Sequence, residues 1–535
     1  MKSLHRTAVE IVTAVAICVG LSSGDGVLAA ASSVKDDKPR DRAARALREG
    51  EFETAENLYR EMVAKKKGDM DARLGLSFAL LKRRKIQDAF DAAARVLSVE
   101  PTSARARALL GAALLAAGDF RLSVEEFRTA LTFKDDEALA IAGLAMVDFY
   151  ENRVSQSLAG LRRAAYLDPN EPDYHFSLGQ VAARSERYAE AADSYERFLR
   201  IAPRTDIDRR ARILGLIDFL RYLGTQRGLL QTAGAARAAI PFELINNRPI
   251  IQIHINGSKE SLRFVVDTGA GMCVVSDATA RRLGIKHVAR GGNARAVGGE
   301  GRFDIVYGFL HSLHLGDARV DNVPIYIRPF FNTQEPIDGY IGLSVLSKYL
   351  SVVDYQTRTM TLMRDDARPI FNSAVTPAGV EVPMRTTTSG FWSGEIQVTG
   401  IDKTLNFIMD TGASISVVSA ALAEREEMSR FAQASRLKVY GAAGVAENVQ
   451  MLLLPRVTLG AHARANVPVA VLDLEPINET SGFEQTGIIG GNVLRHFRVT
   501  FDFQRATVRL DPLGTAAAAP AQGSAKSVPS IAPQN

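Results

Sequence analysis

A chain of 535 residues is too long for a single hydrophobic core, because such cores stop growing at roughly 250–300 residues, so several domains are expected. With 46% hydrophobic and 23% charged residues, the composition excludes a chain that is disordered throughout. The 65 basic residues are nearly balanced by 60 acidic ones, so the charge gives no indication of nucleic-acid binding.

Residues 1–31 have the pattern of a secretory signal peptide. Basic residues precede an apolar run at 11–21, and Leu28 followed by the small residues Ala29, Ala30 and Ala31 suits a cleavage site. A retained membrane anchor through residues 11–21 is the alternative, although this run is shorter than the ~20 residues that span a bilayer. After cleavage only Cys273 remains, so we expect no internal disulfide and a buried, unreactive thiol.

Residues 40–225 have the pattern of a helical repeat domain with a period of about 34 residues. Its turn prolines are Pro101, Pro169 and Pro203, spaced first by two periods and then by one, and each closes a predicted helical hairpin. Small residues recur where paired helices must approach closely, at Gly75, Gly111, Gly143 and Gly179. These segments resemble tetratricopeptide (TPR) repeats, in about five units followed by a capping helix over residues 206–223.

Such arrays bury a core only by stacking, and they present a groove that commonly binds peptides or proteins. We therefore expect the array to bind a protein substrate or a protein partner. A spacer or a dimerisation element is the alternative, because one sequence does not identify the residues of the groove.

Residues 240–513 change to the alternating pattern of β-strands and contain one unit twice. The sequence FVVDTGA at 264–270 has a counterpart in FIMDTGA at 407–413. Further along the chain, GYIGLSVL at 339–346 and GIIGGNVL at 487–494 repeat with nearly the same offset. The duplication predicts two lobes, residues 240–368 and 369–513.

A glycine-rich turn lies between the two motifs of each lobe. The glycines begin at the same distance after the Asp of the DTG sequence in both lobes. Glycine-rich tips in β sequence suit mobile hairpins that close over a cleft, so these turns are candidate flaps. The candidate flap residues are Val297, Gly298, Gly299, Tyr440, Gly441 and Ala442.

In these motifs the chain resembles aspartic peptidases, specifically the bacterial retropepsin-like group, with two fused lobes. The resemblance implies a multidomain α + β protein, in which an N-terminal α-helical TPR-type solenoid precedes an all-β bilobal aspartic peptidase. It also implies that Asp267 and Asp410 form the catalytic pair. The two carboxylates are expected to share one water and one proton, because like charges so close do not both ionise readily.

Four loop residues are expected to support this pair: Thr268, Gly269, Thr411 and Gly412. Glycine allows the sharp turn after each Asp-Thr, and the resemblance implies that the two threonines bond across the lobes. The loops continue with Ala270 and Ala413, where a Ser or Thr hydroxyl would stabilise the carboxylate charge. Because that donor is missing, we predict a pH optimum milder than that of pepsin-like enzymes, above about pH 3.

These patterns together predict an aspartic endopeptidase that acts on protein or peptide substrates without a cofactor or a metal. A non-catalytic binding scaffold with the same fold is the alternative, and lobes that pair with copies in another chain are a second alternative. We expect export, to the periplasm, with secretion or membrane anchoring as alternatives and membrane association only if the signal is retained. Residues 514–535 are rich in Ala, Pro and Ser and predict a disordered tail.

Overall fold

The structure, a computed structural model, describes residues 38–513 except 206, 296, 298–301, 332–335, 369–378 and 443. The predicted signal peptide, residues 1–31, and the predicted tail, residues 514–535, lie outside the described residues.

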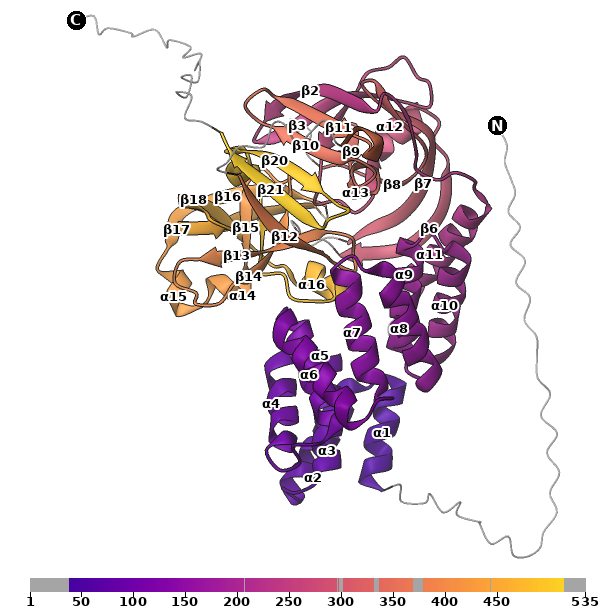
Figure 1. The fold of residues 1–535 in the computed structure, drawn as a ribbon, viewed down its shortest axis with the longest axis vertical. Helices are drawn as coiled ribbons and strands as arrows, with labels where there is room; N and C mark the ends of the chain where they lie inside the picture. The colour runs from indigo at the N-terminus through magenta and orange to yellow at the C-terminus, as the bar shows by residue number, and fades with distance from the viewer. Residues whose placement is uncertain are drawn as a thin grey trace, which may run out of the picture. The chain divides into compact units, whose positions relative to one another are not determined.

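The N-terminal half consists of antiparallel helical hairpins (Figure 1). The hairpin helices are α1 (Pro39–Glu49), α2 (Phe52–Lys65), α3 (Met70–Lys82), α4 (Ile86–Leu97), α5 (Ala104–Ala116), α6 (Phe120–Phe133), α7 (Ala138–Tyr150), α8 (Val154–Leu167), α9 (Pro172–Arg184) and α10 (Tyr188–Ile201). A longer helix, α11 (Ile207–Thr225), follows them. Polar side chains begin several helices: Asp69, Ser103 and Asp119 each accept a hydrogen bond from a backbone N–H of the first turn.

The small residues of the repeats allow aromatic rings to pack against helix backbones. A Cβ atom at Gly75 would overlap the ring of Tyr59, and one at Gly111 or Gly143 would overlap the ring of Phe127. Phe127 is fully buried, so a single ring on α6 fills the space beside both α5 and α7. Close helix contact therefore requires glycine at these repeat positions.

The C-terminal half is built from strands that form two lobes and a shared sheet. Lobe 1 contains β1 (Gln231–Gly234), β2 (Arg237–Ile245), β3 (Arg248–Ile255), β4 (Leu262–Val266), β5 (Cys273–Ser276), α12 (Asp277–Arg282), β6 (His287–Arg295), β7 (Arg302–Leu315), β8 (Ala318–Arg328), β9 (Gly339–Ile341), α13 (Leu343–Leu346), β10 (Leu350–Asp354) and β11 (Thr359–Met363). Lobe 2 contains β12 (Val380–Thr386), β13 (Trp392–Val398), β14 (Leu405–Met409), β15 (Ser416–Ser419), α14 (Ala420–Ala423), α15 (Glu426–Ser429), β16 (Ala432–Gly441), β17 (Gly444–Leu459), β18 (His462–Leu472), α16 (Glu475–Ser481), β19 (Gly487–Ile489), α17 (Gly491–Leu494), β20 (Phe497–Asp502) and β21 (Thr507–Pro512). The β region thus begins at Gln231, before the predicted lobe boundary at residue 240, which falls within β2.

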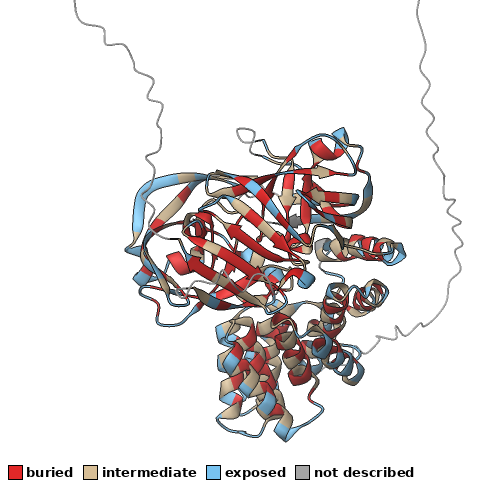
Figure 2. Cartoon of the chain, turned by 45° about the horizontal axis from the view of Figure 1, so that its top comes forward, coloured by how far each residue is buried: buried red, intermediate tan, exposed pale blue. Residues whose placement is uncertain are grey.

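One antiparallel sheet joins the lobes, with the strand order β2-β11-β10-β20-β21-β12. Each lobe supplies three of its strands, and β10 and β20 meet at its centre. Strands β2 and β12 continue into the sheets of their own lobes through β3 and β13. Hydrophobic side chains of both lobes form one continuous core across this sheet. Figure 2 shows buried residues along the strands of this region.

Side chains of the helical repeats and the β lobes share buried contacts. Phe219 of α11 stacks on Tyr307 of β7, with ring centroids 4.2 Å apart. Phe483, which precedes β19, is 1% exposed and packs edge-on against Phe120 and Tyr150 of the repeats. Repeats and lobes are therefore joined by packed aromatic side chains.

The predicted fold class, helical TPR-type repeats followed by a large β region, is confirmed. Among the helices that the structure describes, none combines the length and the apolar character needed to cross a bilayer.

Candidate active site

The two candidate aspartates follow equivalent strands of the two lobes. Asp267 follows β4, and Asp410 follows β14. Each of these strands pairs in parallel with a short strand of its own lobe, β9 or β19. The backbone N–H of Asp267 donates to Ile341 O, and that of Asp410 to Ile489 O, both at 3.0 Å. The GYIG and GIIG segments therefore hold the loops that carry the aspartates.

Thr268 and Thr411 lock the two loops together by reciprocal hydrogen bonds. The Thr268 hydroxyl donates to Met409 O at 2.7 Å and accepts from the backbone N–H of Thr411 at 3.1 Å. In the same way, the Thr411 hydroxyl donates to Val266 O at 2.7 Å and accepts from the N–H of Thr268 at 3.1 Å. Both threonines are buried, so these four bonds fix the position of each loop relative to the other.

Gly269 and Gly412 allow the carboxylates to approach the opposite loops. A Cβ atom at Gly269 would overlap the Asp410 carboxylate, and one at Gly412 would overlap the Asp267 carboxylate. Neither glycine has positive φ, so the requirement is close approach rather than turn geometry. The structure thus brings together all six predicted residues of the pair and its support.

The two carboxylates differ in their hydrogen bonds. Asp410 Oδ1 accepts from the backbone N–H groups of Gly412, at 2.7 Å, and Ala413, at 3.0 Å. Asp267 Oδ1 accepts from the N–H of Gly269 at 2.8 Å. More donors therefore stabilise a negative charge on Asp410.

Burial raises the pKa of both aspartates above the ordinary value for Asp. The pKa of Asp267 is raised strongly, first by burial and then by the neighbouring charge of Asp410. The pKa of Asp410 is raised by burial and held down in part by its hydrogen bonds from Asp267 and the backbone. We infer that the two carboxyl groups share one proton and that Asp267 carries it.

A polar pair beneath each loop was not identified from the sequence. In lobe 2, Ser416 Oγ accepts from the N–H of Gly490 at 3.0 Å, and Asn492 Oδ1 accepts from the N–H of Ser416 at 2.7 Å. In lobe 1 the same bonds are made by Cys273, which accepts from Gly342 N–H at 3.3 Å, and by Ser344. The nearly constant offset between the two copies of the repeated unit relates the pair in lobe 1 to the pair in lobe 2. This offset was the signal in the sequence that could have identified both pairs.

Cys273 is buried, and burial raises the pKa of its thiol to about 11. A thiol that stays protonated is a poor nucleophile. Cys273 therefore has a structural role beneath the Asp267 loop.

The hairpin tips reach the opposite lobes. Val297, at the tip of the β6–β7 hairpin, packs against an apolar cluster of lobe 2. At the tip of the β16–β17 hairpin, the carbonyl of Ala442 accepts a hydrogen bond from Arg328 of lobe 1 at 3.0 Å. The remaining flap candidates of the second hairpin, Tyr440 and Gly441, lie at the end of β16, and Tyr440 is exposed. Gly298 and Gly299 lie outside the described residues.

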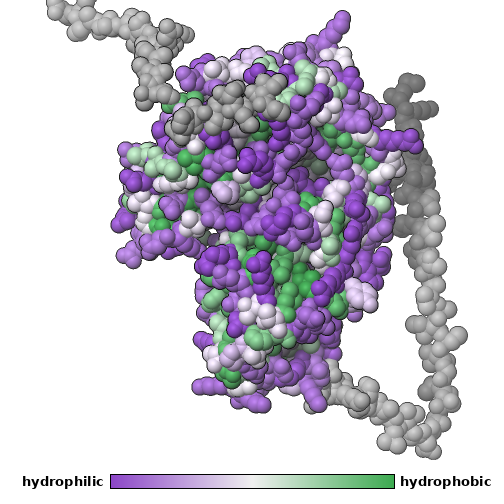
Figure 3. All heavy atoms as spheres, viewed as in Figure 1, coloured by the Kyte–Doolittle hydropathy of each residue, from purple (hydrophilic) through white to green (hydrophobic). Residues whose placement is uncertain are grey.

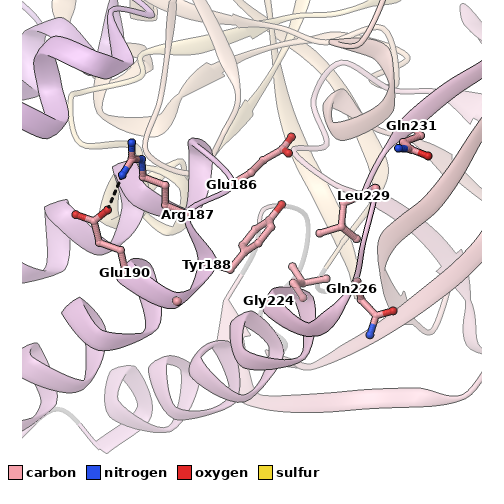
Figure 4. Close-up of a pocket in the computed structure, with 11 residues that line it drawn as sticks. Glu186, Arg187, Tyr188, Glu190, Gly224, Gln226, Leu229 and Gln231 are labelled. Carbon is pink, nitrogen blue, oxygen red and sulfur yellow. Dashed lines mark ion pairs between the residues drawn. The ribbon is translucent and has the colours of Figure 1, made fainter.

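A cavity of about 690 Å³ lies elsewhere, between the ends of α10 and α11 and the segment that leads into β1 (Figure 4). Tyr188 and Leu229 extend into the same hollow, and Glu190 at its rim forms an ion pair with Arg187. Its lining includes no residue of the aspartate loops or the hairpin tips, so this cavity is separate from the aspartate pair.

Within the described part of the chain, no three His, Cys, Asp or Glu side chains converge as a possible metal site.

Comparison with known protein families agrees with this geometry. The family described as aspartyl protease matches residues 251–345 and 395–493, one segment in each lobe. The chain carries an aspartyl protease domain in two segments. Two tetratricopeptide repeat families match residues 46–113 and 143–204, so the protease domain follows TPR repeats, as predicted. No curated protein sequence matches the chain.

Among solved structures, the chain is similar to an aspartic proteinase from Irpex lacteus, at 13% identity and a TM-score of 0.36, over 53% of this chain and 99% of that one. It is also similar to a thermophilic TPR protein of Thermus thermophilus, at 18% identity and a TM-score of 0.29, over 34% of this chain and 97% of that one. MamA from Desulfovibrio magneticus RS-1 aligns at 23% identity and a TM-score of 0.23, over 30% of this chain and 92% of that one.

Proposed function

We propose that this protein is an aspartic endopeptidase that hydrolyses peptide bonds with a water activated between Asp267 and Asp410. The observation that carries the proposal is the reciprocal threonine lock, which holds two partly buried carboxyl groups with raised pKa values against opposite loops. Two acids that share one proton provide a base and an acid at the same site, as peptide hydrolysis requires.

In this mechanism Asp410 acts first as the base and Asp267 as the acid. Asp410 takes a proton from the water, whose oxygen attacks the peptide carbonyl carbon, while Asp267 gives its proton to the carbonyl oxygen. The resulting gem-diol collapses as the C–N bond breaks. The leaving nitrogen takes the proton held by Asp410, and one diol hydroxyl returns a proton to Asp267, so that the pair regains its starting state.

The assignment of base and acid follows from the donors around each carboxylate. Two adjacent backbone N–H groups point at Asp410 Oδ1, whereas one points at Asp267 Oδ1. The charge is therefore better stabilised on Asp410, and the proton is better kept on Asp267.

We also propose that the TPR repeats bring protein substrates or partners to the peptidase. Hydrophobic residues gather over α7 on the face seen in Figure 3, and Leu139, Leu144 and Met146 of this helix are only partly buried. Apolar surface of this kind suits the binding of peptide segments. The signal pattern of residues 1–31 supports export, to the periplasm, and the N-terminal residue of protein recovered from the cell envelope tests its cleavage.

The proposed activity is tested with purified residues 32–535 and an unfolded protein mixture across about pH 3–8. The variants Asp267→Asn and Asp410→Asn keep the shape of each side chain and remove its acid–base function. We expect each to reduce cleavage by about 10²–10⁴-fold, and a statine-type mimic of the tetrahedral state to inhibit the wild type.

Absence of cleavage across this pH range, with peptides still bound, would instead favour a non-catalytic binding scaffold. Unreduced cleavage in both variants would mean that a different group, or a contaminating peptidase, is responsible.

A further inference from the structure

The duplication allows the surroundings of the aspartate pair in the two lobes to be compared position by position. In lobe 1 the parallel pairing of β5 and β8 places Ser276 opposite Arg328. In lobe 2 the parallel pairing of β15 and β18 places Ser419 opposite Leu472. Ser276 and Ser419 both cap the helices that follow these strands, so Arg328 and Leu472 occupy equivalent positions.

The residues around Leu472 form an aliphatic wall. Leu472 belongs to a hydrophobic cluster with Leu474, Ile488 and Ala446, and the hairpin tip residue Val297 packs against the same cluster. The members of this wall that pack on Leu472 are aliphatic.

The residues around Arg328 form a different wall. Its guanidinium lies 5.9 Å from the ring centroid of Phe303, 5.5 Å from that of Phe330 and 5.6 Å from that of Tyr340. Strand pairing makes Tyr340 the equivalent of Ile488, because they lie opposite Val274 and Val417 of the repeated VVS segments.

Chain spacing relates the remaining two rings to the aliphatic wall. Phe330 follows Arg328 by two residues, as Leu474 follows Leu472. Phe303 follows the first flap glycine, Gly298, by five residues, as Ala446 follows Gly441. The two walls are thus built at the same positions, one cationic and aromatic, the other aliphatic.

Both walls lie between a hairpin tip and the aspartates. Arg328 donates to the Ala442 carbonyl of one tip, and the cluster of Leu472 receives Val297 of the other. Arg328 also lies close enough to Asp267 for its charge to oppose the rise in the pKa of that carboxyl. On the other side, Ala413, next to the Asp410 loop, contacts the aliphatic cluster.

Arg328 has unused binding capacity. Within the described residues it forms no ion pair, and its guanidinium donates a single hydrogen bond, to Ala442 O. A guanidinium carries five N–H donors in a planar fork that fits a carboxylate at two points. Arg328 is partly buried, and partial burial of a charge without an ion-pair partner costs free energy that a substrate carboxylate would recover.

We propose that the wall around Arg328 binds an acidic side chain of the substrate, while the equivalent wall around Leu472 binds an aliphatic side chain on the other side of the cleaved bond. The proposal rests on the proposed peptidase function and names its substrate class. It predicts cleavage sites with a Glu or Asp on one side and a large aliphatic residue on the other.

The test uses peptides blocked at both ends, so that terminal carboxylates do not contribute. A library varied on both sides of the bond first locates the acidic position, and a matched pair of peptides then carries Glu or Gln there. At about pH 6, where Glu is ionised, we expect kcat/KM for the Glu peptide to exceed that for the Gln peptide by about 10–100-fold. Below about pH 4.3 the difference should disappear as Glu becomes protonated.

Three variants identify Arg328 as the cause. Arg328→Leu, which copies the residue of lobe 2, should abolish the Glu preference while the Gln peptide is still cleaved, and Arg328→Lys should retain part of the preference. Arg328→Glu should prefer Lys at the same position. Arg281→Leu removes one exposed positive charge on α12 and should leave the Glu preference intact, which excludes an effect of net charge. Equal cleavage of the Glu and Gln peptides by the wild type, or an unchanged preference in Arg328→Leu, would overturn the proposal.

Binding separates this inference from the proposed catalysis. Asp410→Asn should bind the Glu peptide more tightly than the Gln peptide, measured by fluorescence anisotropy, and adding Arg328→Leu should remove the difference. If the wild type cleaves nothing but this difference is seen, the peptidase proposal fails and the acidic subsite stands. Equal binding of both peptides would overturn the subsite.

Discussion

At the scale of single residues, the aspartate pair is held in an unfavourable electrostatic state. Asp267 and Asp410 are brought together and desolvated, and both effects raise the pKa of Asp267. A carboxyl whose pKa is raised by folding keeps its proton at pH values at which the unfolded chain has lost it. The native state then binds more protons than the unfolded state, so stability falls as pH rises from about 3.9 through the folded pKa.

Asp267→Asn should therefore stabilise the protein at neutral pH, because the amide removes the need to bury a second acid beside Asp410. We expect Tm to rise by roughly 1–4 °C at pH 7 and not to rise near pH 3, where both acids are protonated. Calorimetry at both pH values measures the difference. Asp402→Asn, at an exposed position, serves as the control, and a Tm gain that does not depend on pH would contradict the electrostatic explanation.

At the scale of the structural elements, the loops depend on hydroxyl groups rather than on the bulk of their side chains. The hydroxyl of Thr268 is both donor and acceptor, and its two partners, Met409 O and Thr411 N–H, belong to the other lobe. Valine has nearly the same shape but leaves both partners unpaired in a buried place.

We predict that Thr268→Val lowers the free energy of unfolding by about 1–3 kcal/mol for each unpaired group and reduces any peptidase activity. Thr268→Ser keeps the hydroxyl and should restore most of both. Urea unfolding and peptide cleavage measure the two effects. A larger loss in the Ser variant than in the Val variant would show that the methyl group, not the hydrogen bonds, matters.

A second element with a specific role is α11, which the sequence indicated only as a capping helix. Gly215 of α11 lies against the backbone of Arg290 in β6, and Ala211 lies against Gly292. The helix therefore packs on the stem of the hairpin whose tip includes Val297.

Gly215→Ala should destabilise this contact by about 1–3 kcal/mol, because its Cβ would overlap the Arg290 carbonyl and force helix and stem apart. Gly224→Ala on the same helix is the matched control, since its Cβ would meet only Tyr188 Cβ, at 3.9 Å. Hydrogen exchange of the β6–β7 stem should quicken in the first variant alone. Unchanged exchange in Gly215→Ala would mean that the helix does not support the hairpin.

At the scale of the whole molecule, Phe483 joins the repeats to the protease domain. Its ring centroid lies 4.9 Å from that of Phe120 and 5.0 Å from that of Tyr150, and the next residue, Glu484, donates its N–H to Ala116 O at 2.9 Å. A side chain from lobe 2 thus completes the core of the helical array.

We predict that repeats and lobes unfold together in the wild type and that Phe483→Ala uncouples them. Removing a buried Phe costs about 3–5 kcal/mol. The Tm should therefore fall, and the single thermal transition should separate into two. Phe133→Ala, at an exposed Phe on the array, should leave the transition single. Two transitions already present in the wild type would contradict this prediction.

The sequence by itself determined the repeat array and the duplicated β unit, in which Asp267 and Asp410 occupy equivalent positions. These features depend on patterns within a few residues or on the comparison of the chain with itself. Both can be recognised without knowledge of the fold. The sequence also placed Thr268 and Thr411 beside the pair, although only through the resemblance to a family.

Only the tertiary structure decided which groups surround the pair and how they differ. Arg328 is far from Asp267 along the chain, and nothing in its local sequence distinguishes it from other strand-end arginines. Its importance arises because β8 ends near the Asp267 loop and faces the tip of a hairpin from the other lobe. The packing of α11 and Phe483 is equally non-local. Contacts of this kind are set by how whole elements meet, so the chemistry of the cleft walls and the union of the domains emerge only in the folded chain.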